Sequence, residues 1–342
     1  MVICQTPFRV SFFGGGTDYP AWFEQHGGSV LSTAINKYGY ISVRYLPPFF
    51  EFKHRIVYSR IELVNSTDEI QHPAVRAVFK HLNVEEGIEM HYDGDIPAKS
   101  GIGSSSSFTV GLLNALYALR GQIKSKQFLA EEAIQIEQRI IGETVGSQDQ
   151  VAAAYGGFNR INFLPNGKFE VRPMIMPALR QEQMRGSLML FFTGFSRVAE
   201  TIAKSKIENF AQKQRQLFRM KAMVDDAQEI LYSSGDPVAD MGALLDEAWQ
   251  LKRGLSSKVS TDAIDEVYRA GMSAGATGGK LLGAGGGGFI LFMVPPEKQS
   301  AVRMVLRALI EVPIDFDHTG SQIILFNPNM TYLDRRKTKR TA

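Results

Sequence analysis

The sequence predicts an α+β fold for this chain of 342 residues. Segments in which apolar residues alternate are interleaved with segments of helical spacing, and the order lacks the regular βαβ rhythm of a doubly wound sheet. The length predicts two domains, because single hydrophobic cores stop growing at about 250 to 300 residues. A turn, a short strand and the prolines Pro173 and Pro177 mark the boundary, so we expect domains over residues 1–180 and 181–342.

Periodicity predicts the elements of the first domain. A short strand precedes the glycines at 14–16, and alternation predicts further strands over 39–45, 56–64, 87–92 and 158–163. Apolar residues at helical spacing predict helices over 108–119 and 130–141. Pro73 is expected at the first position of another helix, where proline is tolerated.

The second domain has the same mixture of elements. Strands are predicted over 187–193, 289–294 and 322–326. A long charged helix is predicted over 198–232, ended by the sequence Ser-Ser-Gly-Asp-Pro. Further helices are predicted over 238–252, 261–274 and 298–310.

Composition predicts a cytoplasmic enzyme, with no membrane or nucleic acid partner. The chain has 44% hydrophobic residues, 21% charged residues and a formal net charge of +3. No apolar run reaches the roughly 20 residues of a membrane span, and the first residues lack the pattern of a signal peptide. The basic run at 335–340 is interpreted as a solvated end. The oligomeric state stays open, a homodimer included.

Cysteine and histidine usage also bears on the cellular compartment and on metal binding. The single cysteine, Cys4, excludes an internal disulfide and fits a reducing compartment, and its place in the first strand predicts burial. The six histidines are scattered without ligand spacing, so no histidine metal cluster is expected.

Residues 96–107, Ile-Pro-Ala-Lys-Ser-Gly-Ile-Gly-Ser-Ser-Ser-Ser, carry the strongest functional signal. Glycines let the backbone approach a ligand closely, and the following helix points its unpaired N–H groups and its positive dipole end at the loop. Flexible linkers and helix caps have a similar composition. Pro97 and the apolar helix clamp both ends of the loop, which favours a phosphate-binding role.

Two common phosphate-binding motifs do not match this loop. It lacks the Gly-Lys-Ser/Thr ending of a Walker A motif and the Gly-x-Gly-x-x-Gly of dinucleotide-binding folds. Two other glycine-rich segments accompany it: residues 14–16, directly before Thr17-Asp18-Tyr19, and residues 278–288, directly before a strand. Because dense glycine clusters cost conformational entropy, we expect the second one to lie against the phosphate loop and the substrate.

In their order along the chain, these three segments resemble the motifs of the GHMP kinases, the family of galactokinase, homoserine kinase, mevalonate kinase and phosphomevalonate kinase. The resemblance implies a nucleotide-binding N-terminal domain of the ribosomal protein S5 domain 2 type and a ferredoxin-like C-terminal domain, with the active site between them. It implies ATP as cofactor, held by the loop residues Lys99, Ser100, Gly101, Ile102, Gly103, Ser104, Ser105 and Ser106.

The resemblance also assigns the chemistry of phosphoryl transfer. Asp149 matches the family's catalytic aspartate, which accepts or orients the substrate proton, and Arg9 supplies positive charge near the transferring group. Ser104 and Glu137 match the family's Mg²⁺ ligands.

The first motif departs from its galactokinase-type form, in which Glu and His precede Thr-Asp-Tyr. Glycines replace both side chains in this sequence, which makes room for a bulkier sugar. The resemblance implies that the segment binds the substrate through Gly15, Gly16, Thr17 and Asp18.

Residues 68–73, 192–197 and the region of Lys280 look like the bacterial branch that converts D-glycero-D-manno-heptose 7-phosphate into heptose 1,7-bisphosphate for nucleotide-activated heptose and surface glycans. A phosphorylated sugar needs a second anion site, for which a guanidinium is well suited. We expect Arg197 to form it, with Lys280 as partner and Gly286 as a further substrate contact. Two alternatives stay open: a 1-kinase of an unphosphorylated sugar, as galactokinase and fucokinase are, and a non-catalytic relative that binds nucleotide or sugar.

Overall fold

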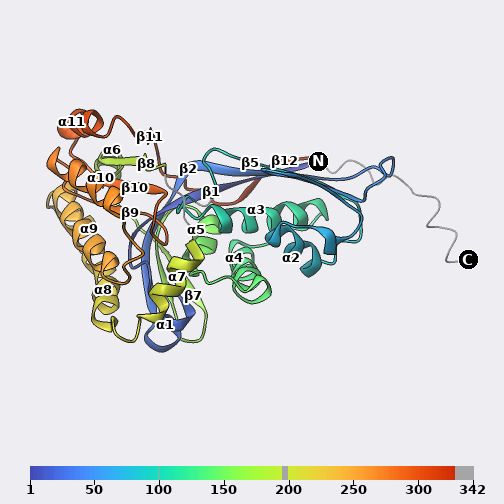
Figure 1. Ribbon diagram of the computed structural model, residues 1–342, viewed down its shortest axis with the longest axis horizontal. Helices are drawn as coiled ribbons and strands as arrows, with labels where there is room; N and C mark the ends of the chain where they lie inside the picture. The colour runs from blue at the N-terminus through green and yellow to red at the C-terminus, as the bar shows by residue number, and fades with distance from the viewer. Residues whose placement is uncertain (99, 195–198, 328–342) are drawn as a thin grey trace, which may run out of the picture.

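Two β-sheets organise the chain, and the computed structural model describes residues 1–98, 100–194 and 199–327 (Figure 1). The strands of the larger, eight-stranded sheet pair in the order β12 (Gln322–Phe326), β1 (Val2–Phe13), β2 (Gly28–Tyr45), β5 (Ile88–Gly94), β3 (His54–Val57) and β4 (Ile61–Val64). The same sheet continues from β2 through β6 (Phe158–Phe163) to β7 (Phe169–Pro173). The four-stranded sheet has the order β11 (Ile310–Val312), β8 (Leu188–Phe192), β10 (Phe289–Met293) and β9 (Gly278–Leu281). This mixture confirms the predicted α+β class.

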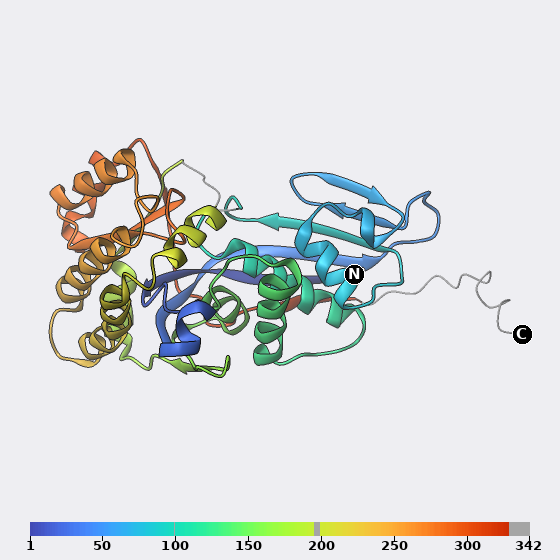
Figure 2. The same ribbon diagram turned by 60° about the horizontal axis from the view of Figure 1, so that its bottom comes forward.

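Helices from the first half of the chain gather on one face of the larger sheet (Figures 1 and 2). They are α2 (Pro73–His81), α3 (Ser104–Leu119), α4 (Lys126–Gln135), which continues into the π-helical turn η2 (Ile136–Ile141), and α5 (Gln148–Tyr155). The other helices are α1 (Pro20–His26), α6 (Ala178–Gly186), α7 (Ala199–Glu208), α8 (Gln214–Tyr232), α9 (Pro237–Arg253), α10 (Asp262–Ser273) and α11 (Gln299–Val305), with 3₁₀ turns η1 (Thr67–Glu69) and η3 (Pro296–Lys298). Among the described residues, no helix is both long and apolar enough to cross a membrane.

Helix α3 is central to the first core because it is apolar on all sides. It packs against β1, β2 and α5, and nearly all of its residues are buried. The helix begins at Ser104 rather than at the predicted position 108, because the serines of the loop form its first turn. The direction of its axis matters for function, because the first N–H groups of a helix have no partners within it.

Strand β2 is much longer than the predicted strand over 39–45. All of its residues from Gly28 to Ile35 are buried, so this half of the strand lacks the alternation that identifies a half-exposed strand. It pairs with β1 along almost its whole length, and β12 pairs with the other edge of β1. The predicted last strand is therefore present, and it returns the chain to the larger sheet.

Three further predicted elements are wrong in extent. The strand over 56–64 is the hairpin β3–β4, because the N–H of Tyr58 donates to the carbonyl of Arg60 and turns the chain. The helix over 198–232 is split into α7 and α8. Phe210, in the turn between them, packs against Tyr19 with the two ring centres 6.1 Å apart. The helix over 298–310 ends at Val305, and β11 follows it.

Candidate active site

The phosphate loop predicted from sequence opens into a cavity of about 310 Å³. Gly101 and Gly103 have φ angles of 84° and 77°, a left-handed conformation that glycine adopts without strain. Gly103 is the N-cap of α3, so the first N–H groups of the helix lack partners within it. The cavity wall includes Gly101, Gly103 and the serines at 104–106. This loop can therefore bind an anion through main-chain N–H groups and the helix dipole.

The second glycine-rich loop, residues 283–288, lies directly against the phosphate loop, as the sequence predicts. A Cβ atom on Gly283 would lie 2.5 Å from the Cα of Gly101, and one on Gly288 would lie 2.1 Å from the carbonyl oxygen of Ser100. No side chain fits between the two backbones at such distances. Glycine is thus required at both positions for steric reasons.

Arg9 and Asp149 form a bidentate ion pair in the same wall. The Nε of Arg9 donates to Oδ1 of Asp149 over 2.7 Å, and its Nη2 donates to Oδ2 over 2.9 Å. Arg9 also donates to the carbonyl of Gly101 through Nη1 (2.9 Å) and to that of Ile102 through its main-chain N–H (3.0 Å). Arg9 therefore couples the carboxylate in the first turn of α5 to the phosphate loop.

Asp18 is buried beside this pair and lines the cavity. Its Oδ1 accepts the N–H of Gly16 over 2.8 Å, and its Oδ2 accepts Nε2 of Gln148 over 2.9 Å. Burial raises the pKa of Asp18, and the charge of Asp149 raises it further against the effect of the Gly16 hydrogen bond. Asp18 thus fixes the glycine turn to α5 and presents a carboxylate to the cavity.

Glu137 lies in the π-helical turn η2, one layer behind the cavity wall. Its Oε2 accepts hydrogen bonds from Oγ of Ser106, over 2.8 Å, and from Nε2 of Gln150. Its Oε1 is buried and has no hydrogen-bond partner among the described residues. Burial raises the pKa of Glu137 to about 7. A buried carboxylate oxygen without a donor is costly unless a cation or a water meets it.

Three buried lysines complete the cavity: Lys206 from α7, Lys252 from α9 and Lys280 from β9. Burial lowers the pKa of Lys206 to about 8 and that of Lys280 to about 7, and it lowers the pKa of Lys252 well below its usual value. The sequence indicates only Lys280. Lys206 and Lys252 lie in helices rich in charged residues, and nothing in their spacing distinguishes them from solvated side chains.

The other predicted site residues fall into three groups. Gly15 and Gly16 line the cavity, as do Ser104 and Ser105. Thr17 does not, because its hydroxyl donates to the carbonyls of Gly14 and Ser29. Three further predicted residues, Ser100, Ile102 and Gly286, are not in the cavity wall either, and Gly286 donates its N–H to the carbonyl of Val259. Lys99 and Arg197 lie outside the described residues.

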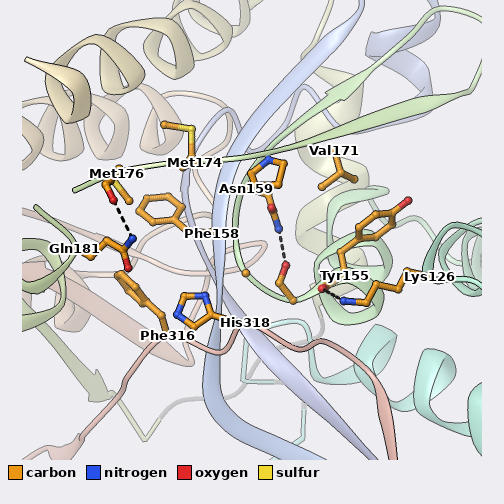
Figure 3. Close-up of a pocket in the computed structure, with 13 residues that line it drawn as sticks. Lys126, Tyr155, Phe158, Asn159, Val171, Met174, Met176, Gln181, Phe316 and His318 are labelled. Atoms are coloured by element: carbon orange, nitrogen blue, oxygen red, sulfur yellow. Dashed lines mark hydrogen bonds between the residues drawn. The ribbon is translucent and has the colours of Figure 1, made fainter. Parts of the chain in front are cut away.

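A second cavity, of about 370 Å³, lies at the other end of α5 (Figure 3). Its wall is mainly apolar, with Phe158, Met174 and Phe316 among its residues, and it contains no carboxylate. Its polar side chains are largely engaged: Nζ of Lys126 donates to the carbonyl of Tyr155, as Figure 3 shows, and to that of Thr319. The residues with acid, base and anion-binding chemistry therefore converge on the first cavity.

Comparisons with known proteins agree with this geometry. The sequence matches the family profile described as GHMP kinases N terminal domain over residues 69–157, and the one described as GHMP kinases C terminal over residues 237–311. A D-glycero-alpha-D-manno-heptose 7-phosphate kinase from Campylobacter jejuni is 29% identical over 321 residues, which are 89% of this chain and 92% of that protein. An L-fucokinase/L-fucose-1-P guanylyltransferase from Bacteroides fragilis is 26% identical over 88% of this chain and 35% of its own length.

A solved structure shares the fold. The crystal structure of a D-glycero-D-manno-heptose 1-phosphate kinase from Bacteroides thetaiotaomicron superimposes with a TM-score of 0.78 and 23% sequence identity. The superposition covers 96% of this chain and 100% of the other.

Proposed function

This chain belongs to the GHMP kinase family, and we propose that it is an ATP-dependent sugar kinase that phosphorylates the anomeric hydroxyl of D-glycero-D-manno-heptose 7-phosphate. The product would be heptose 1,7-bisphosphate, a precursor of nucleotide-activated heptose for surface glycans. The proposal includes a cytoplasmic location, where ATP is available, and a domain boundary near residue 180, in α6 directly before β8.

One observation carries the proposal: the Arg9–Asp149 ion pair touches the phosphate loop in the wall of a cavity that also contains Asp18. Phosphoryl transfer depends chiefly on positioning the reactants and neutralising charge. The loop and the N-terminus of α3 would hold the phosphates of ATP. Asp149 would accept or orient the proton of the attacking hydroxyl, Arg9 would face the developing negative charge, and Asp18 with Gly15 and Gly16 would hold the sugar.

The residues around Glu137 fit a magnesium ion. Mg²⁺ prefers oxygen ligands and usually binds through one or two carboxylates together with substrate phosphates. Glu137 offers the unpartnered Oε1, and Ser104 lines the cavity. No group of three or more His, Cys, Asp or Glu side chains in the described part of the chain could hold a metal ion alone. When bound, Mg²⁺ would neutralise phosphate charge.

Glu137→Gln is therefore expected to raise the magnesium concentration needed for half-maximal activity by about 10- to 100-fold, as loss of a metal-site partner typically does. Initial rates measured against free Mg²⁺ at constant ATP would show it. Glu131→Gln is the matched control, because Glu131 is an exposed carboxylate of the adjoining helix α4. An unchanged magnesium requirement in a folded Glu137→Gln protein would contradict this assignment.

The substrate is tested by comparing acceptors in a coupled assay of ADP release. We expect kcat/KM for heptose 7-phosphate to exceed that for free heptose by at least about 100-fold, the effect of two charge-assisted hydrogen bonds to the phosphate. Mannose, galactose and fucose complete the panel. No preference for the phosphorylated sugar would reject the substrate while leaving the kinase assignment in place.

A second candidate is a 1-kinase of an unphosphorylated sugar, favoured by the fucokinase relatives. Besides the Bacteroides fragilis protein, a bifunctional fucokinase/GDP-fucose pyrophosphorylase from Arabidopsis thaliana is 24% identical over 92% of this chain and 31% of its own length. The same acceptor panel separates the two candidates. A non-catalytic relative is disfavoured, because a protein that only binds its ligands has no need of the Arg9–Asp149 pair.

A further inference from the structure

Three lysine side chains line the active-site cavity, and we call them the lysine cluster: Lys206, Lys252 and Lys280. Their exposed fractions are 4%, 6% and 4%. Lysine is almost never buried to this extent unless its charge is paired. The cluster therefore needs either internal partners or a bound anion.

Internal hydrogen bonds account for only part of the cluster. Lys252 donates to the carbonyls of Leu281 and Gly283, each over 2.7 Å, so it fastens β9 and the glycine loop. Lys280 donates to the carbonyl of Phe12 over 2.7 Å, and its other two N–H groups have no acceptor among the described residues. Lys206 has no hydrogen-bond acceptor among the described residues, and its ammonium lies 5.5 Å from the ring centre of Tyr19.

The nearby carboxylates are already engaged. Asp18 and Asp149 are the acids whose charges act on Lys206. Asp149 is held by the guanidinium of Arg9, and Asp18 accepts hydrogen bonds from Gly16 and Gln148. Burial lowers the pKa of Lys280, and the nearby positive charges of Arg9 and Lys206 lower it further. The cavity wall has four basic side chains, those of Arg9 and the lysine cluster, against three carboxylates, those of Asp18, Glu143 and Asp149.

We propose that Lys206 and Lys280 bind the phosphate that the sugar acceptor already carries. Lys252 has a structural role, because its hydrogen bonds hold β9 and the glycine loop. This inference rests on the proposed function. A phosphate monoester offers several oxygens to the free N–H groups of both ammonium groups and supplies the missing negative charge. The nucleotide phosphates have donors of their own, because Gly101, Gly103 and the serines at the start of α3 also line the cavity. Lys206 is thus a specificity-determining residue.

The decisive variant is Lys206→Met, assayed with heptose 7-phosphate and with unphosphorylated heptose. Methionine is unbranched and of similar length, so it fills the same space without a charge. We expect KM for heptose 7-phosphate to rise at least about tenfold, the size of a lost charge-assisted hydrogen bond. The loss with free heptose should be much smaller, because that acceptor carries no phosphate, and KM for ATP should change little. Lys204→Met, an exposed lysine of α7, is the matched control and should change neither.

Equal losses with both acceptors would overturn the inference, because Lys206 would then act on a group that both reactions share. Unchanged kinetics with both acceptors would overturn it as well. Thermal unfolding verifies that each variant is folded, and Lys206→Gln, which also removes the charge, replaces Lys206→Met if the latter does not fold.

A second measurement separates this inference from the proposed substrate. Inorganic phosphate is titrated calorimetrically into the full-length protein saturated with a non-hydrolysable ATP analogue, so that the phosphate loop is filled. Lys206→Met should weaken phosphate binding at least about tenfold. If the wild type does not prefer the phosphorylated sugar, the substrate proposal fails, and this titration still decides the anion site. Equal phosphate affinity in the wild type and Lys206→Met would reject the anion site.

Discussion

Asp149→Asn is expected to lower kcat by about 10²- to 10⁴-fold, the contribution of a positioned proton acceptor. Asparagine has the same shape and retains an oxygen that can accept from Arg9, so the phosphate loop should keep its position. KM for ATP should therefore change little, and the loss should fall on kcat. Steady-state kinetics with ATP and the preferred sugar measure both constants.

Asp225→Asn is the control for this prediction, because Asp225 also pairs with an arginine. Its Oδ1 lies 2.6 Å from Nη1 of Arg160, but Asp225 is 60% exposed and lies outside the cavity wall. Exposed ion pairs contribute about 0 to 1 kcal/mol. We expect wild-type kinetics for Asp225→Asn. A wild-type kcat for Asp149→Asn would remove Asp149 from the chemistry.

Sequence reasoning locates the parts of the site that depend on backbone conformation. The glycines at 101 and 103, and those at 283 and 288, must be glycine because of a positive φ angle or a close backbone approach. Such requirements can be recognised in the sequence, because they place glycines at fixed positions. The acidic residue Asp149 is identified through its motif, and the structure brings it to Arg9 from 140 positions away.

Sequence reasoning misses the parts of the site that depend on tertiary burial. Lys206 lies in a segment that reads as a long charged helix, and solvated lysines are the rule in such helices. The chain turns after α7 and packs Phe210 against Tyr19, which buries the same face of α7 that carries Lys206. Gln148 escapes notice for a similar reason, since only the folded structure places its amide against Asp18.

The extents of β2 and η2 illustrate a second limit. Periodicity identifies an element only where one face is exposed, and the first half of β2 is buried on both faces. The predicted helix over 130–141 is present, but a π-helical turn replaces its last part and carries Glu137. π-helical turns are rare, and those that occur are often at functional sites. The residue pattern of this segment does not predict one.

Gly283→Ala is expected to disrupt the site without touching a catalytic group. The added Cβ would lie 2.5 Å from the Cα and 2.8 Å from the carbonyl oxygen of Gly101, so one of the two loops must move. Gly101 accepts a hydrogen bond from Arg9 and begins the segment that leads into α3. Displacement of about 1 Å can lower a rate by about 100-fold when reacting groups depend on exact placement. We expect kcat to fall by about that factor and KM for ATP to rise.

Gly121→Ala separates this steric effect from backbone strain. Gly121 has a φ of +73°, close to the +67° of Gly283, but a Cβ there meets nothing within 4 Å. Both variants should lose stability of about 1 kcal/mol from the left-handed backbone, measured by thermal unfolding. Only Gly283→Ala should lose activity, because only there does the methyl group push on the phosphate loop. Equal kinetics in the two variants would mean that contact between the glycine loops does not position the nucleotide.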